Sequence, residues 1–102
     1  MADWNGFEIT PAELADRLEG GDPLQVLDIR APDSVAAGTI DAPRFHNVRG
    51  SVMMRMDDPA EAGLDPDTPV AVVCAHGNSS QPVTHLLRQK GWTAQSLKGG
   101  VT

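Results

Sequence analysis

The sequence predicts an α/β fold whose central sheet is mainly parallel. Short apolar runs alternate along the chain with stretches of helical periodicity, which is the order of elements in parallel-sheet proteins. The run at residues 69–74 is apolar throughout, as expected for a strand buried on both faces of such a sheet. The 102 residues, of which 40% are hydrophobic and 22% charged, fit one globular domain spanning residues 1–102.

The first elements are a short extended segment at residues 7–9 and a helix that follows it. Thr10 can cap this helix, Pro11 suits its first position, and Glu13 is placed to complete a capping box. The glycine pair at residues 20–21 ends the helix.

The next strand is expected at residues 24–29, where apolar residues dominate and an acid lies near the end. Residues 30–33 are typical of a turn. Residues 33–37 then predict a short helix that is closed by Gly38.

Weaker signals follow. Residues 39–40 predict, together with Phe45 further on, another short strand around a proline break. Residues 51–56 show weak helical periodicity. Residues 57–68 contain two prolines and a glycine and predict a loop.

The last part of the chain has the clearest pattern. The apolar strand at residues 69–74 leads into a polar turn at residues 75–80. A helix is expected from about residue 80 to residue 90, and a last strand at residues 93–97. A Gly-Gly turn follows at residues 99–100.

The charge balance excludes several classes of partner. Fourteen acidic residues against eight basic ones give a net charge of −6. Such a chain repels phosphate backbones and anionic lipids, which argues against nucleic-acid and membrane binding. No stretch approaches the roughly 18 consecutive apolar residues of a membrane span. The N-terminus lacks the basic and apolar regions of a signal peptide, so we expect a cytoplasmic protein.

The chain has one cysteine, Cys74, which therefore forms no internal disulfide. It is either a small buried hydrophobe or a reactive thiol. It lies where the most apolar strand ends, and sites in parallel sheets lie at the carboxyl ends of strands. The turn and helix start after it aim backbone N–H groups inward, which would stabilise a thiolate. Gly77 permits the sharp turn, and Ser79 or Ser80 can cap the helix.

Two long stretches resemble the rhodanese-like domains. The first is LQVLDIRAPDSVAAGTI, which is similar to the family's Asp-x-Arg strand end, its proline-started short helix and its Gly-x-Ile turn. The second is PVAVVCAHGNSSQPVTHLLRQKGWTAQSLKGG, which resembles the family's catalytic strand, cysteine loop, following helix and closing Gly-Gly. The resemblance as a whole extends over nearly the whole chain, and these two stretches are the parts that carry its motifs. The resemblance implies a rhodanese-like fold, with a mainly parallel five-stranded sheet flanked by helices on both faces.

The resemblance also implies a sulfurtransferase. Cys74 would be the nucleophile that accepts a sulfane sulfur as a persulfide and passes it on. The donor would be thiosulfate or a persulfide, the acceptor cyanide or a thiol, and a protein could serve as either. No cofactor and no metal ion are implied, and Asp28 and Arg30 would brace the loops. The residues expected to bind the substrate are Ala75, His76, Gly77, Asn78, Ser79 and Ser80.

The sequence departs from the family at several positions. Active family loops often have arginines where this chain has Ala75 and Ser79, so only His76 can bring positive charge to the loop. The chain ends at Thr102, before the family's usual tryptophan segment. A Glu, an aromatic residue and a His that are usual in the family's second motif are replaced by Ser34, Val35 and Thr39.

These departures keep other functions open. One is a rhodanese-like regulatory or protein-interaction module without turnover. Another is a sulfur carrier that takes sulfane sulfur only from a protein donor. Related phosphatases have an arginine where this chain has Ser80, which argues against phosphatase activity.

Other residues have plainer explanations. His85 is expected at the surface beside the apolar face of its helix, and one cysteine with three scattered histidines forms no zinc pattern. Met53, Met54 and Met56 predict core or lid packing rather than a soft-metal site. The acids at residues 57–67 predict a solvated loop rather than a calcium site.

Overall fold

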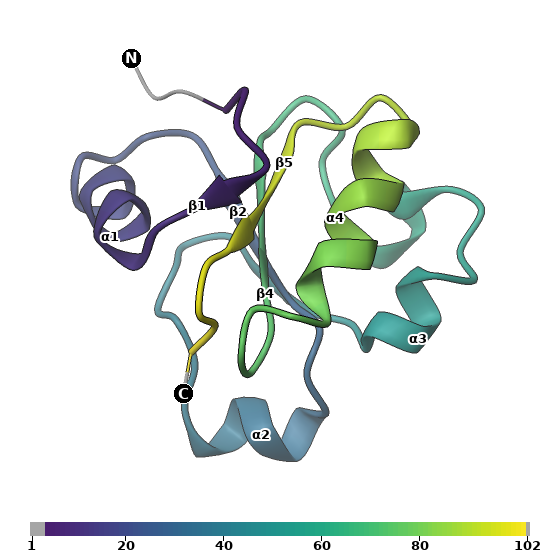
Figure 1. Cartoon of the computed structure of the whole chain (residues 1–102), viewed down its shortest axis with the longest axis horizontal. Helices are drawn as coiled ribbons and strands as arrows, with labels where there is room; N and C mark the ends of the chain where they lie inside the picture. The colour runs from purple at the N-terminus through teal and green to yellow at the C-terminus, as the bar shows by residue number, and fades with distance from the viewer. Residues whose placement is uncertain (1–3, 102) are drawn as a thin grey trace.

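A computed structural model describes residues 4–101 and has a five-stranded sheet at its centre (Figure 1). Every strand pairing is parallel, and the order across the sheet is β1-β5-β4-β2-β3. The predicted α/β fold with a parallel sheet is therefore confirmed, and β4 is the central strand. The strands are β1 (Glu8–Ile9), β2 (Gln25–Asp28), β3 (Phe45–Asn47), β4 (Val70–Val73) and β5 (Ala94–Leu97).

Helices cover both faces of the sheet. In Figure 1, α1 lies on one side of the sheet and α3 and α4 lie on the other, while α2 lies beyond the carboxyl ends of the strands. Cover on both faces explains why every residue of β2, β4 and β5 is buried. The helices are α1 (Pro11–Glu19), α2 (Pro32–Ala37), α3 (Gly50–Met53), α4 (Ser80–Gln89) and the 3₁₀ helix η1 (Pro59–Ala62).

The start of α1 follows from its first residues. The Glu13 N–H donates to Thr10 Oγ1 at 3.2 Å, and the Thr10 N–H donates to Glu13 Oε1 at 3.1 Å. The expected capping box is therefore confirmed, with Pro11 at the first helical position. Leu14 buries the inner face of the helix against the sheet.

The alternation of side chains along β4 explains where Cys74 points. Val72 and Cys74 belong to the buried cluster beneath α4, whereas Ala71 and Val73 belong to the cluster beneath α1. Successive side chains of a strand point to opposite faces. The Cys74 side chain therefore lies on the α4 face, where the chain turns into that helix.

Residues 39–40 belong to no strand, contrary to the prediction. The third strand is β3, which starts at Phe45 and pairs with β2. The Thr39 hydroxyl instead donates to the Asp28 carboxylate at 2.7 Å, and Arg30 donates to the carbonyl oxygen of the preceding residue. Side chains from the end of β2 therefore hold this segment, in place of strand pairing.

Two other predictions need smaller corrections. The helix expected at residues 51–56 is shorter and is α3. The predicted loop at residues 57–68 contains η1, whose start is capped by Asp58 through a hydrogen bond from the Ala60 N–H at 3.0 Å. A single 3₁₀ turn leaves little periodic signal in a sequence because it is so short.

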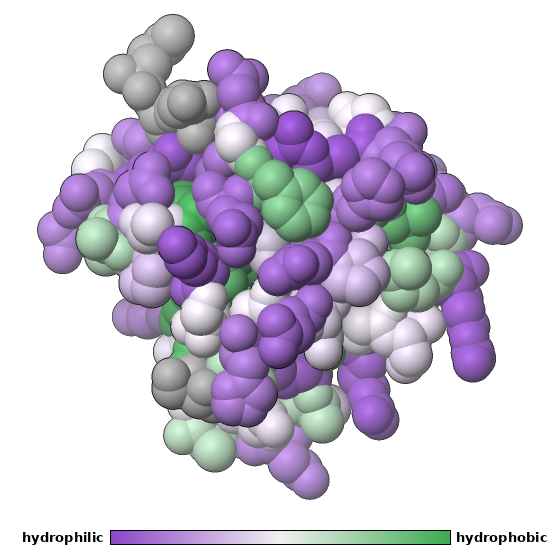
Figure 2. Space-filling view, in the orientation of Figure 1, coloured by the Kyte–Doolittle hydropathy of each residue, from purple (hydrophilic) through white to green (hydrophobic). Residues whose placement is uncertain are grey.

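The surface in Figure 2 is mostly hydrophilic, with small and separate apolar patches. The large hydrophobic side chains exposed in the described part of the chain are Val52 and Met54, each 47% exposed, and both belong to α3 or its end. Within residues 4–101, no helix has both the length and the apolar character needed to cross a membrane.

Candidate active site

Cys74 directly follows β4 and is only 3% exposed. Its neighbours in the cluster beneath α4 include Ile29 and Val83. From Cys74 the chain turns through residues 75–79 into α4, at the carboxyl edge of the sheet (Figure 1). This is the position at which parallel sheets place their binding sites.

Backbone N–H groups of the turn converge on the sulfur. The Gly77 N–H donates to Cys74 Sγ at 3.0 Å. The backbone N–H groups of Ser80 and His76 also act on the thiol. A turn that leads into a helix N-terminus and directs several N–H groups at one atom favours an anion there.

The Ser80 side chain contacts the sulfur instead of capping α4. Its Oγ lies 3.3 Å from Cys74 Sγ and 2.6 Å from Ser96 Oγ. Ser79 is the N-cap residue but makes no side-chain capping hydrogen bond. The prediction that a serine hydroxyl caps this helix is therefore wrong. Ser79 has helical backbone angles, φ −69° and ψ −23°, instead of the extended angles of a capping residue, and Ser80 is engaged by Cys74 and Ser96.

These contacts act on the pKa of Cys74 in opposite directions. Burial raises the pKa of the thiol, but the hydrogen bond with the Ser80 side chain and those from the backbone of Ser80, Gly77 and His76 outweigh it. The pKa of Cys74 therefore lies below its ordinary value. More of the sulfur is then thiolate at neutral pH, and the thiolate is the nucleophilic form.

The turn is packed against the glycine pair that follows β5. Gly77 adopts φ +83°, and a Cβ added there would lie 2.7 Å from the Gly99 backbone nitrogen. A Cβ on Gly100 would lie 2.6 Å from the Cys74 carbonyl oxygen, which also accepts a hydrogen bond from the Val101 N–H at 3.1 Å. Two backbone segments meet here, and only glycine leaves room for that approach.

Asp28 and Arg30 form a two-point ion pair at the end of β2. Arg30 Nη2 lies 2.8 Å from Asp28 Oδ2, and Arg30 Nε lies 3.0 Å from Oδ1. Burial raises the pKa of Asp28, but the hydrogen bonds from Arg30 and Thr39 hold it below its ordinary value. The pair braces the segment after α2, because Arg30 also donates to the Gly38 carbonyl oxygen at 2.6 Å.

The charge of Cys74 also acts on Arg30. Its hydrogen bond to Asp28 is the main cause of its raised pKa, and the negative charge of Cys74 raises that pKa further. The guanidinium therefore lies within electrostatic reach of the thiolate, although Asp28 already neutralises most of its charge.

The six predicted substrate-binding residues differ in their burial. Gly77 and Ser80 are buried and contact the sulfur. Ala75 is half-buried. The exposed members of the set, on the outer side of the turn, are His76, Asn78 and Ser79.

Sequence reasoning missed Ser96 and treated the glycines at residues 99–100 only as a turn. The glycine pair does carry a usable signal, because adjacent glycines mark places where backbones can approach closely. Ser96 carries none. It is placed beside the site by the β4–β5 register, which pairs it with Val72 on the α4 face.

The residues given plainer explanations lie largely as expected. His85 is exposed on α4. Met53 is 1% exposed and Met56 packs against the same cluster, as core side chains do, whereas Met54 is exposed. Burial lowers the pKa of His46. In the part of the chain that the structure describes, no group of three or more His, Cys, Asp or Glu side chains could hold a metal ion.

Comparison with known proteins identifies the family. The family model for the rhodanese-like domain matches residues 10–102. This chain belongs to the rhodanese-like family. Among its relatives is the thiosulfate sulfurtransferase GlpE of Pseudomonas aeruginosa, which is 38% identical over 96 residues, covering 90% of this chain and 77% of that protein.

Solved structures of rhodanese-like proteins share the fold. The rhodanese-related protein of Thermoplasma volcanium superposes with a TM-score of 0.76 at 28% identity, over 93% of this chain and 86% of that one. The human single-domain sulfurtransferase TSTD1 superposes with a TM-score of 0.75 at 23% identity, over 95% and 93% of the two chains. The rhodanese-like fold implied by the sequence motifs is thus confirmed.

Proposed function

We propose that this rhodanese-like protein is a sulfurtransferase that moves a sulfane sulfur from thiosulfate or a persulfide to a thiophilic acceptor, through a persulfide on Cys74. The observation that carries the proposal is the thiol at the end of the central strand, with the Gly77 N–H directed at its sulfur and the Ser80 hydroxyl in hydrogen-bond contact with it. The name of the related GlpE protein, a thiosulfate sulfurtransferase, supports it.

In the first half-reaction the Cys74 thiolate attacks the outer sulfur of the donor. A bond forms between Cys74 Sγ and that sulfur, and the bond to the rest of the donor breaks. The electron pair of the broken bond leaves with sulfite when the donor is thiosulfate, or with a thiolate when it is a persulfide. The lowered pKa of Cys74 supplies the attacking thiolate.

In the second half-reaction the acceptor attacks the outer sulfur of the Cys74 persulfide. Cyanide leaves as thiocyanate, or a thiol leaves as a new persulfide, and the Cys74 thiolate is restored. Both half-reactions place negative charge on sulfur inside the turn. The Gly77 N–H and its neighbours are already oriented to stabilise that charge, so no reorganisation is needed during the reaction.

This scheme needs no cofactor and no metal ion, because the thiol carries the transferred atom. It does need a reduced thiol, and we therefore assign the reaction to the cytoplasm, where thiols are kept reduced. A protein that donates or accepts the sulfur would approach the exposed side of the turn, at His76 and Asn78.

Intact-mass measurement of the reduced protein tests the proposal. Wild-type protein is treated with thiosulfate and, separately, with a low-molecular-weight persulfide. We expect a gain of one sulfur atom that cyanide or a thiol then removes, and no gain in Cys74→Ser. If folded wild-type protein gains no sulfur from either donor, the proposal fails. The better conclusion is then a non-catalytic interaction module, in keeping with Ala75 and Ser79 at the positions of the family's loop arginines.

A further inference from the structure

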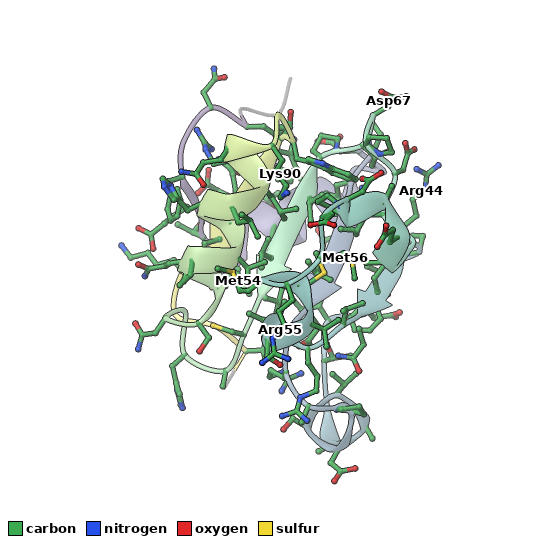
Figure 3. All side chains as sticks on the ribbon, turned by 90° about the vertical axis from the view of Figure 1, so that its right-hand side faces the viewer. Arg44, Met54, Arg55, Met56, Asp67 and Lys90 are labelled. Atoms are coloured by element: carbon green, nitrogen blue, oxygen red, sulfur yellow. The ribbon has the colours of Figure 1, made fainter. Side chains whose placement is uncertain are left out.

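A pocket opens at the carboxyl edge of the sheet, between the segment before α2, α3 and the start of α4. Its volume is about 400 Å³, within the range of small-molecule sites. The apolar part of its wall includes Ile29, Met54 and Val83, and the polar part includes Ser79 and Arg49. Figure 3 faces this side of the molecule and shows Met54 and Arg55 on the segment beside α4.

The wall of this pocket adjoins the thiol. Asp28 pairs with Val73 in the β2–β4 register, and the Ile29 N–H donates to the Val73 carbonyl oxygen at 2.9 Å. Ile29 therefore lies beside Cys74, one strand spacing of roughly 4.8 Å away. Ile29, Val83 and Cys74 also belong to one buried cluster. The pocket and the thiol therefore share Ile29 and Val83 as neighbours, since both residues line the pocket and both belong to the cluster that contains Cys74.

Arg49 is the cation available in this pocket. Its side chain is exposed, and among residues 4–101 its guanidinium makes no hydrogen bond or ion pair. Arg30, by contrast, is bound by Asp28. The turn at residues 75–80 contains no lysine or arginine, and the net charge of the chain is −6. An anion that approaches Cys74 can therefore find a free side-chain guanidinium at Arg49.

We propose that this pocket binds the organic part of a low-molecular-weight persulfide that carries a carboxylate, with Arg49 binding that carboxylate. This inference rests on the proposed function. A guanidinium matches a carboxylate with two parallel hydrogen bonds, and the apolar wall suits the aliphatic stem between the acid and the sulfur. Thiosulfate has no such stem, so it uses only part of the site.

The reaction in this pocket keeps the balance of the first half-reaction. The Cys74 thiolate attacks the outer sulfur of R–S–SH, a Cys74 S–S bond forms, and the donor's own S–S bond breaks. The products are the Cys74 persulfide and the thiolate R–S⁻. Arg49 takes no part in these bonds, and its role is to bind the acid group of R and so to select the donor.

The test compares two donors and two matched variants. The donors are the persulfides of 3-mercaptopropionate and of 2-mercaptoethanol, which differ mainly in charge. The variants are Arg49→Met and Arg55→Met, which remove the same charge from neighbouring exposed positions, although Arg55 does not line the pocket. For Arg49→Met we expect the KM for the carboxylate donor to rise about fivefold while its kcat stays the same. The KM and kcat for the neutral donor should not change. Arg55→Met should match wild type with both donors.

A second readout does not depend on sulfur transfer. Cys74 is alkylated with iodoacetate, which is an anion, and with neutral iodoacetamide. The rate constant for iodoacetate divided by that for iodoacetamide should fall several-fold in Arg49→Met and stay unchanged in Arg55→Met. Equal changes in both variants, or no change in either, would overturn the role of Arg49. If no donor loads Cys74, the proposed function fails, while the alkylation ratio still decides whether Arg49 binds anions at this site.

Discussion

Ser80 Oγ lies 3.3 Å from Cys74 Sγ and 2.6 Å from Ser96 Oγ, and both serines are fully buried. A hydroxyl has one proton to donate. In the thiol form Cys74 can donate to Ser80, but beside the thiolate this hydrogen bond reverses and Ser80 becomes the donor. The Ser80 oxygen is then free to accept the proton of Ser96. At the scale of single residues, Ser96 therefore acts on the sulfur through Ser80.

We expect Ser80→Ala to slow the alkylation of Cys74 by iodoacetamide at pH 7 about fivefold, because a hydrogen bond to the thiolate contributes about 1 kcal/mol. Ser96→Ala should slow it less. The double variant should be no slower than Ser80→Ala, since Ser96 works through Ser80. The pH dependence of each rate reports the pKa of the Cys74 thiol, which should rise less in Ser96→Ala than in Ser80→Ala.

Thr84→Val is the matched control for this comparison. Thr84 is also fully buried on α4, and its hydroxyl donates to the Ser80 carbonyl oxygen at 2.7 Å, away from the sulfur. It should lower stability without changing the alkylation profile. None of these substitutions alters Arg30, so its electrostatic effect on Cys74 is the same in every variant. Additive effects of the two serine substitutions would show that Ser96 acts independently of Ser80.

At the scale of elements, the geometry of the cysteine turn depends on its contact with the turn after β5. Gly77 and Gly91 both adopt positive φ, +83° and +88°, but their surroundings differ. A Cβ on Gly77 would meet the backbone of Gly99, whereas a Cβ on Gly91 would meet nothing within 4 Å. Comparing these two glycines separates the cost of the backbone conformation from the cost of the close approach.

We expect Gly91→Ala to reduce the free energy of unfolding by about 1 kcal/mol, the cost of a left-handed alanine. Gly77→Ala should cost about 2–3 kcal/mol, because the turn must also move away from Gly99. It should also slow Cys74 alkylation, since that movement displaces the Gly77 N–H from the sulfur. Urea denaturation measures the change in the free energy of unfolding for both variants. Equal destabilisation by the two substitutions would contradict the packing argument.

At the scale of the whole molecule, the end of β2 ties several segments together. The Asp28 carboxylate holds Arg30 and Thr39, and the Asn47 side chain donates to the Asp28 and Arg30 carbonyl oxygens at 2.9 and 3.0 Å. Asp28 is 0% exposed, so its charge has no water to replace a lost partner. The ion pair therefore ties the end of β2 to the segment after α2, and the Asn47 amide ties the same end to β3.

We expect Asp28→Asn to lower stability at pH 7 by about 3 kcal/mol, because Arg30 loses its buried partner. The folded pKa of Asp28 lies below the unfolded value of about 3.9. The ionised carboxylate therefore stabilises the protein fully above that value, and the contribution is lost as the pH falls through the folded pKa. Urea denaturation at pH 7 and near pH 3 should show the wild-type advantage shrinking. A constant difference would refute this assignment.

Local signals in the sequence were sufficient for several elements and insufficient for others. The capping box of α1 and the apolar run of β4 are features of adjacent residues, and both were located correctly. Residues 39–40 carry strand-forming side chains, yet the Asp28 carboxylate binds Thr39 from eleven positions away along the chain. A long-range hydrogen bond of this kind leaves no trace in the local pattern, and here it prevents strand formation.

Patterns of adjacent residues were enough to predict most of the strands and helices, the location of Cys74 at the end of the most buried strand, and the glycine-containing turn after it. These features depend on periodicity, apolar runs and turn chemistry, which are local properties of the chain. Three contacts depend instead on the folded chain: the hydrogen bond between Ser80 and Ser96, the packing of the glycines after β5 on the turn, and the place of Arg49 in a pocket with Ile29 and Val83. These contacts join residues far apart in the sequence, and they exist only because parallel strands bring their carboxyl ends to one edge of the sheet.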